Sequence, residues 1–256
     1  MKQIPNLFTL LNLIAGCLAI VFILQTGEGI VNYNGGEWKI YLPEKIWWGS
    51  VCIGLAAIID FLDGFVARLF KASSEMGKQL DSLADVVSFG VAPGVILYQL
   101  LRISLIREEN GMEATIIWLL PAFILSGAAA YRLAKFNLDT SQQYGFKGVP
   151  TPAVGLLIAS FPLMLHYGGG IININQWLIN RWVLYALIVV LSWLMVSNLP
   201  LMALKFKDYS LKNNLPKVIL LSIAVLAILF FKWGAIPVIF IAYIILSLLF
   251  KNKSTR

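Results

Sequence analysis

The feature that most constrains the fold of this chain is a series of long apolar blocks. Each block has roughly 17–25 residues, which is the length that crosses a bilayer as an α-helix. Of the 256 residues, 59% are hydrophobic and 13% are charged, whereas about a quarter of the residues in a soluble domain are charged. Signals for β-strands are absent, and a membrane β-barrel would need segments of about ten residues with alternating hydrophobicity. The sequence therefore predicts an all-α, polytopic helical bundle in a membrane.

The apolar blocks predict eight membrane-spanning helices. They lie at about 6–25, 46–70, 79–101, 114–137, 150–167, 181–200, 215–231 and 233–250. Only Lys232-Trp233-Gly234 separates the last two, so we expect them to form a hairpin. The first block has a weak basic start and no small-residue cleavage site, so we expect no cleaved signal peptide. We expect one domain over residues 1–256, with its core at about 1–200 and an extra hairpin at about 215–250.

The net charge of +7 raises the question of a nucleic-acid partner, and the placement of the charges argues against one. If the amino terminus is cytoplasmic, 14 of the 20 Lys and Arg residues fall in cytoplasmic segments, whereas most glutamates fall outside. This asymmetry is the positive-inside pattern, and it predicts that both termini are cytoplasmic. A basic inner surface suits anionic lipid headgroups, so we expect membrane lipids as partners and no nucleic acid.

Four aspartates interrupt the second and third apolar blocks, in the stretch DFLDGFVARLFKASSEMGKQLDSLAD. Asp60 and Asp63 are three residues apart, and Asp81 and Asp85 are four apart, so each pair lies on one face of a helix. The polar segment 71–77 between the pairs supplies the only turn in this stretch. The two carboxylate pairs are therefore predicted to face each other near the cytoplasmic membrane surface.

Carboxylates held this close together repel one another, and one or two divalent cations offset that repulsion. Oxygen-only ligands suit Mg²⁺ or Mn²⁺ rather than zinc. A two-metal site can clamp a phosphate and activate an oxygen nucleophile. The alternative is an ion or proton pathway, which intramembrane carboxylates also mark.

Small and basic residues accompany the aspartates. Gly64, Ala67 and Gly77 would let a flat base or a pyrophosphate approach the backbone, although glycines also permit close helix packing. Arg68 can bind phosphate through its planar guanidinium, or it can anchor the helix at the inner membrane surface.

The residues with other ligand chemistry predict no second site. Cys17 and Cys52 both lie inside predicted spans, which indicates packing rather than a disulfide or a zinc pattern. His166, the only histidine, falls on the opposite side of the membrane, where we expect it to be interfacial rather than catalytic. Separately, we expect the aromatic residues near span ends to be interface anchors: Trp38, Tyr41, Trp47, Trp48, Trp177, Trp182 and Trp233.

The aspartate stretch matches the pattern D-x2-D-G-x2-A-R-x8-G-x3-D-x3-D over 26 residues. Every fixed position is present, as Asp60, Asp63, Gly64, Ala67, Arg68, Gly77, Asp81 and Asp85. The stretch thereby resembles the signature of the CDP-alcohol phosphatidyltransferases. In that family an alcohol attacks the lipid-bearing phosphate of a CDP-linked donor, and CMP leaves. The resemblance implies that the four aspartates bind two divalent cations, that Asp85 is the general base, and that Gly64, Ala67, Arg68 and Gly77 hold the CDP moiety.

Three further stretches resemble the bacterial and archaeal phosphatidylserine synthases of this family. They are IPNLFTLLNLIAGCLAIVF near the amino terminus, SGAAAYRLAKFN at 126–137 and GFKGVPTPAVGL at 145–156. The resemblance, which reaches to about residue 160, implies CDP-diacylglycerol as donor, L-serine as acceptor, and a homodimer. Asn6 and Thr9 are predicted either to contact the nucleotide or to cap the first helix.

A serine molecule needs a cation for its carboxylate and an acceptor for its ammonium group. Arg132 is our candidate for the first and Asn137 for the second, with the helix expected to end near Phe136. Lys135 stands where the relatives usually have a second arginine, and it lacks bidentate geometry. The alternative for Arg132 and Lys135 is that they anchor the cytoplasmic end of the fourth span.

Other acceptors and other classes of function remain open at this point. Glycerol 3-phosphate or inositol phosphate would need extra cations, which Arg132, Lys135 and Lys147 could supply, and neutral inositol would not. A transporter would spread its carboxylates over several broken helices in two related halves, unlike the single aspartate hairpin seen here. A structural scaffold would give no reason for the matched spacing.

Overall fold

The computed structural model describes residues 4–33, 36–69, 74–108, 115–138, 146–170, 175–202 and 211–250. Within them, five helical runs are long and apolar enough to cross a membrane, and two apolar helices are shorter. This confirms the predicted all-α, polytopic membrane fold. The prediction that both termini are cytoplasmic falls on residues outside the described ones, and the count of eight crossings stays a prediction.

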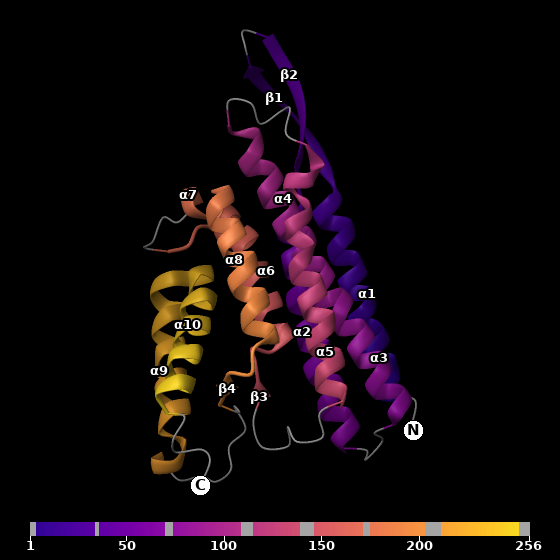
Figure 1. Ribbon diagram of the computed structural model, residues 1–256, viewed down its shortest axis with the longest axis vertical. Helices are drawn as coiled ribbons and strands as arrows, with labels where there is room; N and C mark the ends of the chain where they lie inside the picture. The colour runs from indigo at the N-terminus through magenta and orange to yellow at the C-terminus, as the bar shows by residue number, and fades with distance from the viewer. Residues whose placement is uncertain are drawn as a thin grey trace.

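The first two helices form the most extensive helix pair of the molecule. Helices α1 (Ile4–Leu24) and α2 (Ile46–Leu69) run side by side over most of their length (Figure 1). Strands β1 (Thr26–Tyr33) and β2 (Gly36–Pro43) connect them as an antiparallel hairpin that projects beyond one end of the bundle.

The β1–β2 hairpin corrects our expectation that strand signals are absent. Both strands carry β-branched and aromatic residues, among them Val31, Tyr33 and Trp38, and such residues favour strands. In the sequence, an Asn-Gly pair separates the two strands, and this pair is a strong hairpin signal. The local signal was therefore present, but it lies in a loop between two much longer apolar blocks.

A single buried helical run forms the centre of the bundle. It consists of α3 (Glu75–Asp85), the π-helical segment η1 (Val86–Val91) and α4 (Ala92–Ile106). Of its most apolar window, 67% is buried, whereas no other membrane-length run exceeds 33%. Helices α1, α5, α6 and α8 all pack against this run, which is why most of its residues beyond Asp85 are apolar.

The second half of the chain surrounds this central run. Two 3-10 turns, η3 (Ile116–Trp118) and η4 (Leu120–Phe123), lead into α5 (Ile124–Leu138). Helices α6 (Thr151–Tyr167), α7 (Asn175–Leu178) and α8 (Arg181–Val196) follow. The two-residue strands β3 (Phe146–Lys147) and β4 (Pro200–Leu201) pair antiparallel at one end of the bundle. Helix α5 ends at Leu138, two residues beyond Phe136, near which we expected its end.

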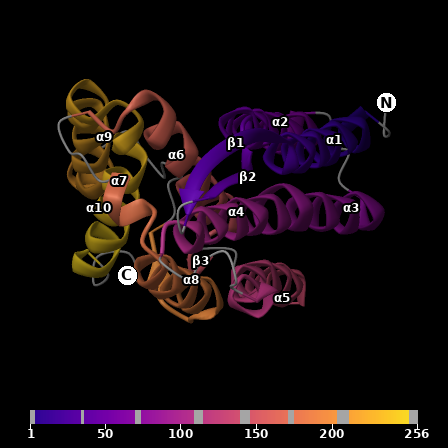
Figure 2. The same cartoon turned by 90° about the horizontal axis from the view of Figure 1, so that it is seen from above.

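The last two helices form the predicted hairpin. They are α9 (Leu211–Phe231) and α10 (Ala235–Leu249), joined by the turn η5 (Lys232–Gly234). Seen from above in Figure 2, α9 and α10 lie at one end of the molecule, and α1, α2 and α3 lie at the other. Gly170, with φ of +79°, packs against this hairpin, and a side chain there would meet the Phe230 carbonyl at 2.5 Å.

An aromatic cluster joins α2, α6 and η5 at the end of α2 opposite its aspartates. Trp47 stacks on Trp48 and on His166, and Tyr167 lies edge-on to Trp47 and near Trp233. His166 is therefore remote from the carboxylates, as expected from the sequence.

Small residues set the closest helix crossings, as they do generally between membrane helices. A side chain at Gly16 of α1 would lie 2.9 Å from the Cα atom of Ser88 in η1. A side chain at Gly90 would lie 3.0 Å from Ala129 of α5. These glycines fix the distance of α1 and α5 from the central run.

We predict that Gly16→Ala destabilises the protein, because the added methyl group must displace the backbone of η1. Overpacking of this kind costs about 1–3 kcal/mol. The matched control is Gly54→Ala in α2, where no described atom lies within 4 Å of the added methyl group. Thermal unfolding of the two variants in detergent should show a lower midpoint for Gly16→Ala alone. An unchanged midpoint for Gly16→Ala would mean that this crossing is not tightly constrained.

Candidate active site

Three of the four aspartates come together where α2 and α3 meet. Asp60 of α2 and Asp81 and Asp85 of α3 each present a carboxylate oxygen, and these oxygens all lie within 4.8 Å of one another. Asp85 is buried, and the other two are half-buried. Helix α1 packs against both α2 and α3 and closes one side of the cluster. The helical spacing of the aspartates thus brings together residues that are 25 positions apart in the chain.

The fourth aspartate, Asp63, turns toward α1 instead. Thr9 Oγ1 donates a hydrogen bond to Asp63 Oδ2 and also lies 3.2 Å from the Pro5 carbonyl. The other carboxylate oxygen of Asp63 is buried and has no hydrogen-bond partner among the described residues. Thr9 therefore holds Asp63, a contact that the sequence did not predict.

Asn12 is a site residue that our sequence analysis missed. Its amide nitrogen donates a hydrogen bond to Asp85 Oδ1 at 3.2 Å, and Ser88 Oγ donates one to its backbone carbonyl at 3.0 Å. Asn12 is fully buried. A polar side chain inside an apolar span is expensive and is commonly functional, so its place in TLLNLIAG was the available signal.

The π-helical segment begins at the residue after Asp85. Such segments occur mostly as single turns and often at functional sites. Here it lies between the cluster end of α3 and the buried helix α4, so it sets how Asp85 is oriented toward α1.

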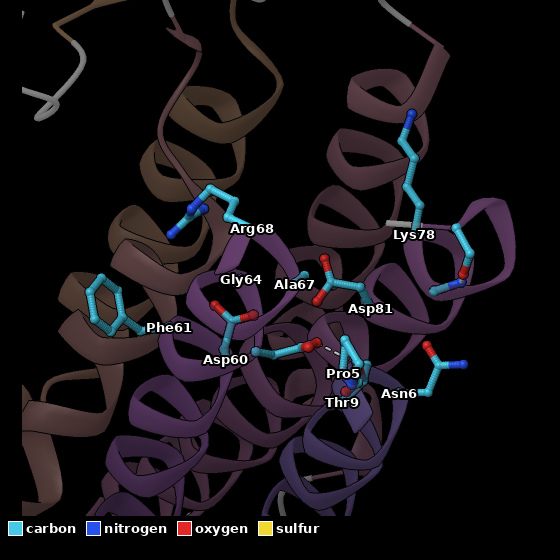
Figure 3. A pocket seen from close by; sticks show the side chains of 13 residues that line it. Pro5, Asn6, Thr9, Asp60, Phe61, Gly64, Ala67, Arg68, Lys78 and Asp81 are labelled. Atoms are coloured by element: carbon cyan, nitrogen blue, oxygen red, sulfur yellow. Dashed lines mark hydrogen bonds between the residues drawn. The ribbon is translucent and has the colours of Figure 1, made fainter. Parts of the chain in front are cut away.

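A cavity of about 410 Å³ opens beside the carboxylate cluster (Figure 3). All six residues predicted to hold CDP line it: Asn6, Thr9, Gly64, Ala67, Arg68 and Gly77. Asp60, Asp63 and Asp81 also line it, so the predicted nucleotide-binding residues and three of the carboxylates surround the same cavity. The lining is completed by Pro5, Phe61, Ser74 and Lys78, and none of these four was predicted to belong to the site.

The two glycines of the motif have different surroundings. A side chain at Gly64 would meet only Arg68 Nη1, at 3.5 Å, so this helix face is open to the cavity. A side chain at Gly77 would lie 3.1 Å from both Asn6 Oδ1 and Ser74 Oγ. The Ser74 hydroxyl accepts a hydrogen bond from the Gly77 amide and caps α3. Gly64 thus leaves room for a ligand, whereas Gly77 permits close packing around the cap.

The residues predicted to contact an acceptor are all on α5, but they point to different neighbours. Arg132 is 8% exposed, its Nη1 donates to Thr151 Oγ1 at 3.1 Å, and its guanidinium lies over the Phe136 ring. Asn137 donates to Ser82 Oγ at 2.8 Å, and Lys135 donates to Asn198 Oδ1 at 2.8 Å. A buried Arg132 is not a simple surface anchor.

Arg132 is the residue of this group that interacts electrostatically with the carboxylate cluster. It is near enough to Asp85 for their charges to attract, and its Nε is buried without a partner among the described residues. Asn137 reaches the cavity through Lys78, whose ammonium group donates to the Asn137 carbonyl at 3.1 Å.

The carboxylate cluster offers the donor atoms of a metal site. Asp60, Asp81 and Asp85 offer only carboxylate oxygens, the ligands that hard divalent cations such as Mg²⁺ and Mn²⁺ prefer. The described residues bring no histidine or thiol to the cluster. The arrangement therefore suits a hard divalent cation.

Comparison with known proteins agrees with the motif. The family model for CDP-alcohol phosphatidyltransferase matches residues 2–195. Similar curated proteins are named CDP-diacylglycerol–serine O-phosphatidyltransferase. One from Helicobacter pylori (strain 26695) is 32% identical over 86% of this chain and 80% of its own length. One from Bacillus subtilis (strain 168) is 34% identical over 66% of this chain and 82% of its own length.

A third relative with the same name comes from Mycobacterium leprae and is 32% identical over 78% of this chain. The match spans only 58% of that protein's length. Because the family model covers most of the chain and includes all four aspartates, this protein belongs to the CDP-alcohol phosphatidyltransferase family.

Proposed function

We propose that this protein transfers the phosphatidyl group of CDP-diacylglycerol to L-serine, giving phosphatidylserine and CMP. The observation that carries the proposal is a cavity that is lined by seven of the eight signature residues and adjoins the carboxylate cluster, to which the eighth, Asp85, belongs. The names of the similar proteins supply the choice of serine.

The cavity has the chemistry to hold a CDP-linked lipid. The side chains of Arg68 and Lys78 are exposed at its lining and can bind the pyrophosphate. Gly64 leaves the space that a flat base needs. Phe61 lines the cavity and is 68% exposed, on the apolar face of α2 that includes Ile58 and Phe65. The acyl chains of the donor could thus stay in the bilayer while its head group enters the site.

Asp60, Asp81 and Asp85 are the residues that would hold a divalent cation, and the family uses such ions. Asp63, with one buried carboxylate oxygen unpartnered among the described residues, is the candidate to help hold the second of the two predicted cations. Bound Mg²⁺ or Mn²⁺ would offset the negative charge of the pyrophosphate and of the departing CMP.

Asp85 is the proposed general base. Its carboxylate takes the proton from the serine hydroxyl while the serine oxygen bonds to the lipid-bearing phosphorus, and the bond from that phosphorus to the CMP oxygen breaks. Asn12 is a positioning residue, because its amide nitrogen fixes one oxygen of Asp85. No covalent intermediate with the protein is needed.

Arg132 is the proposed partner of the serine carboxylate. It is buried and attracted to Asp85, and its Nε has no partner among the described residues. A guanidinium with unused donors suits a carboxylate. Asn137 remains the candidate for the ammonium group, because its amide nitrogen is used on Ser82 and its oxygen is the group that can accept.

No observation favours a phosphorylated acceptor over serine. Such an acceptor would need several cations, yet the ammonium group of Lys135 is held by Asn198. The transporter alternative is not favoured either, because the carboxylates lie at one end of one helix pair.

We further propose that the site faces the cytoplasm and that the protein forms a homodimer. The positive-inside pattern supports a cytoplasmic-facing site in the cell membrane. A homodimer is expected from the family resemblance.

An acceptor screen tests the proposed function directly. Purified protein would receive CDP-diacylglycerol, Mg²⁺ or Mn²⁺, and either serine, glycerol 3-phosphate, inositol or inositol phosphate in separate reactions. We expect CMP release together with a lipid of the mass of phosphatidylserine, with serine only. CMP release with another acceptor would keep the aspartate chemistry and refute the choice of serine.

We predict that Asp85→Asn leaves donor binding intact and lowers kcat by about 10²–10⁴-fold, the usual contribution of a general base. Asn12→Ala should lower kcat less, because Asp85 keeps its carboxylate and loses only its orientation. CMP binding by calorimetry and single-turnover product formation would separate the two effects. A near-normal kcat for Asp85→Asn would refute its assignment as the base.

We predict that Arg132→Ala raises the KM for serine much more than the KM for CDP-diacylglycerol. A charge-assisted hydrogen bond is worth about 1.5–3 kcal/mol, so the KM for serine should rise by about ten- to a hundredfold. Arg181→Ala is the control, because it also removes a guanidinium, but one that pairs with Glu108 at 2.8 Å. Equal effects of Arg132→Ala on both KM values would refute a serine-specific role.

A further inference from the structure

The C-terminal hairpin (α9, η5 and α10, residues 211–249) lies beyond the part of the chain that the family model matches. Helix α10 has the sequence AIPVIFIAYIILSLL, in which Tyr243 and Ser247 are the only polar side chains. They are four residues apart and so lie on one face of the helix. Both are buried, at 8% and 2% exposure.

Both polar side chains of α10 form hydrogen bonds with the backbone of one residue, Met202. Tyr243 Oη donates a hydrogen bond to the Met202 carbonyl at 3.1 Å, and the Met202 amide donates to Ser247 Oγ at 3.3 Å. Ser247 Oγ also donates to the Tyr243 carbonyl at 2.7 Å. Helix α10 thereby holds both backbone polar groups of a residue that directly follows strand β4.

Strand β4 in turn holds the segment that leads into α6, which we call the acceptor-side segment (residues 146–151). Phe146 and Lys147 pair with Leu201 and Pro200. The Gly148 amide donates to the Leu199 carbonyl at 2.9 Å, and the Val149 amide donates to the Leu194 carbonyl at 3.1 Å.

Gly148 shows how closely this segment lies against the end of α8. Its φ is +75°, a conformation that favours glycine. A side chain there would lie 2.5 Å from the Met195 carbonyl and 2.7 Å from the Ser197 carbonyl. The segment therefore has little freedom to move relative to α8 and β4.

The acceptor-side segment ends at the residue that holds Arg132. Thr151 is fully buried, and its hydroxyl oxygen accepts the hydrogen bond from Arg132 Nη1. A second link runs from Asn198, just before β4, to Lys135 of α5. A continuous set of contacts thus joins α10, through Met202, β4 and the acceptor-side segment, to Arg132.

We propose that Tyr243 and Ser247 are positioning residues that fix the acceptor-side segment and hence the orientation of Arg132 toward the acceptor alcohol. The inference rests on the proposed function for the identity of that acceptor, serine. The cavity that would take the donor is lined by residues of the first 81 positions and has no contact with α10 among its lining residues. Loss of either hydroxyl therefore affects acceptor binding and leaves donor binding unchanged.

The test uses the full-length protein and measures KM for serine and for CDP-diacylglycerol separately. The variants are Tyr243→Phe and Ser247→Ala, with Ser247→Thr to restore the hydroxyl. We expect Tyr243→Phe and Ser247→Ala each to raise the KM for serine by about fivefold, as expected for one lost neutral hydrogen bond. Ser247→Thr should return toward the wild-type KM. The KM for the donor should not change.

Tyr185→Phe is the matched control. Tyr185 of α8 also donates from its hydroxyl to a backbone carbonyl at 2.7 Å, but the acceptor is Trp118 of η3 rather than Met202. We expect both KM values of this variant to equal those of the wild type.

Two results would overturn the proposal. A purely structural role would lower the active fraction and kcat without changing either KM, and a general distortion would raise both KM values together. If the wild type turns over another alcohol instead of serine, the proposed function fails, and the same KM comparison with that alcohol still tests the role of α10.

Discussion

The site depends on the packing of α1 against the pair formed by α2 and α3. Carboxylates near a bilayer are costly unless they have partners, and α1 supplies those partners. Thr9 binds Asp63 and Asn12 binds Asp85, while one turn further along Gly16 allows α1 to approach Ser88 of the central run. Helix α1 thus exposes apolar side chains such as Leu7 and Ile14 on its outer face, and its inner face carries the polar groups that the aspartates require.

The arrangement divides the molecule into two functional sides around the central run of α3, η1 and α4. On one side, α1, α2 and α3 build the cavity and the carboxylate cluster. On the other, α5, the start of α6 and the β3–β4 pair surround Arg132. Figure 2 shows the same division seen from above, with α4 between α1 and α5 and the C-terminal hairpin beyond α6 and α8.

Sequence alone predicted the features that follow from helical periodicity and from length. The apolar blocks gave helix positions close to those observed, and the spacing of Asp60, Asp81 and Asp85 correctly predicted that their carboxylates meet. The contacts that α1 makes with these helices could not be predicted in this way. That Asp63 turns to Thr9, and that Asn12 reaches Asp85, depends on how α1 is rotated in the bundle.

The acceptor side shows the same limit of prediction from sequence. Arg132 and Asn137 are five residues apart, and a helix that continues to Leu138 puts them about 140° apart around its axis. They therefore face different neighbours, Thr151 and Ser82, and only the extent of the helix determines this. The sequence did not indicate a role for Tyr243 for a related reason, because its hydrogen-bond partner Met202 is 41 residues away in the chain.

Asp85 occupies the position where the two sides meet. It is the last residue of α3, and the π-helical turn begins immediately after it. Its carboxylate shares the cluster with Asp60 and Asp81, is held by Asn12 from the donor side, and is attracted by Arg132 from the acceptor side. In the proposed reaction the lipid donor enters from the bilayer and serine from the water. A base that accepts the proton of one substrate beside the phosphate of the other has to lie at this junction. Among the four aspartates, Asp85 is the one that accepts a hydrogen bond from Asn12 and is also attracted by the charge of Arg132.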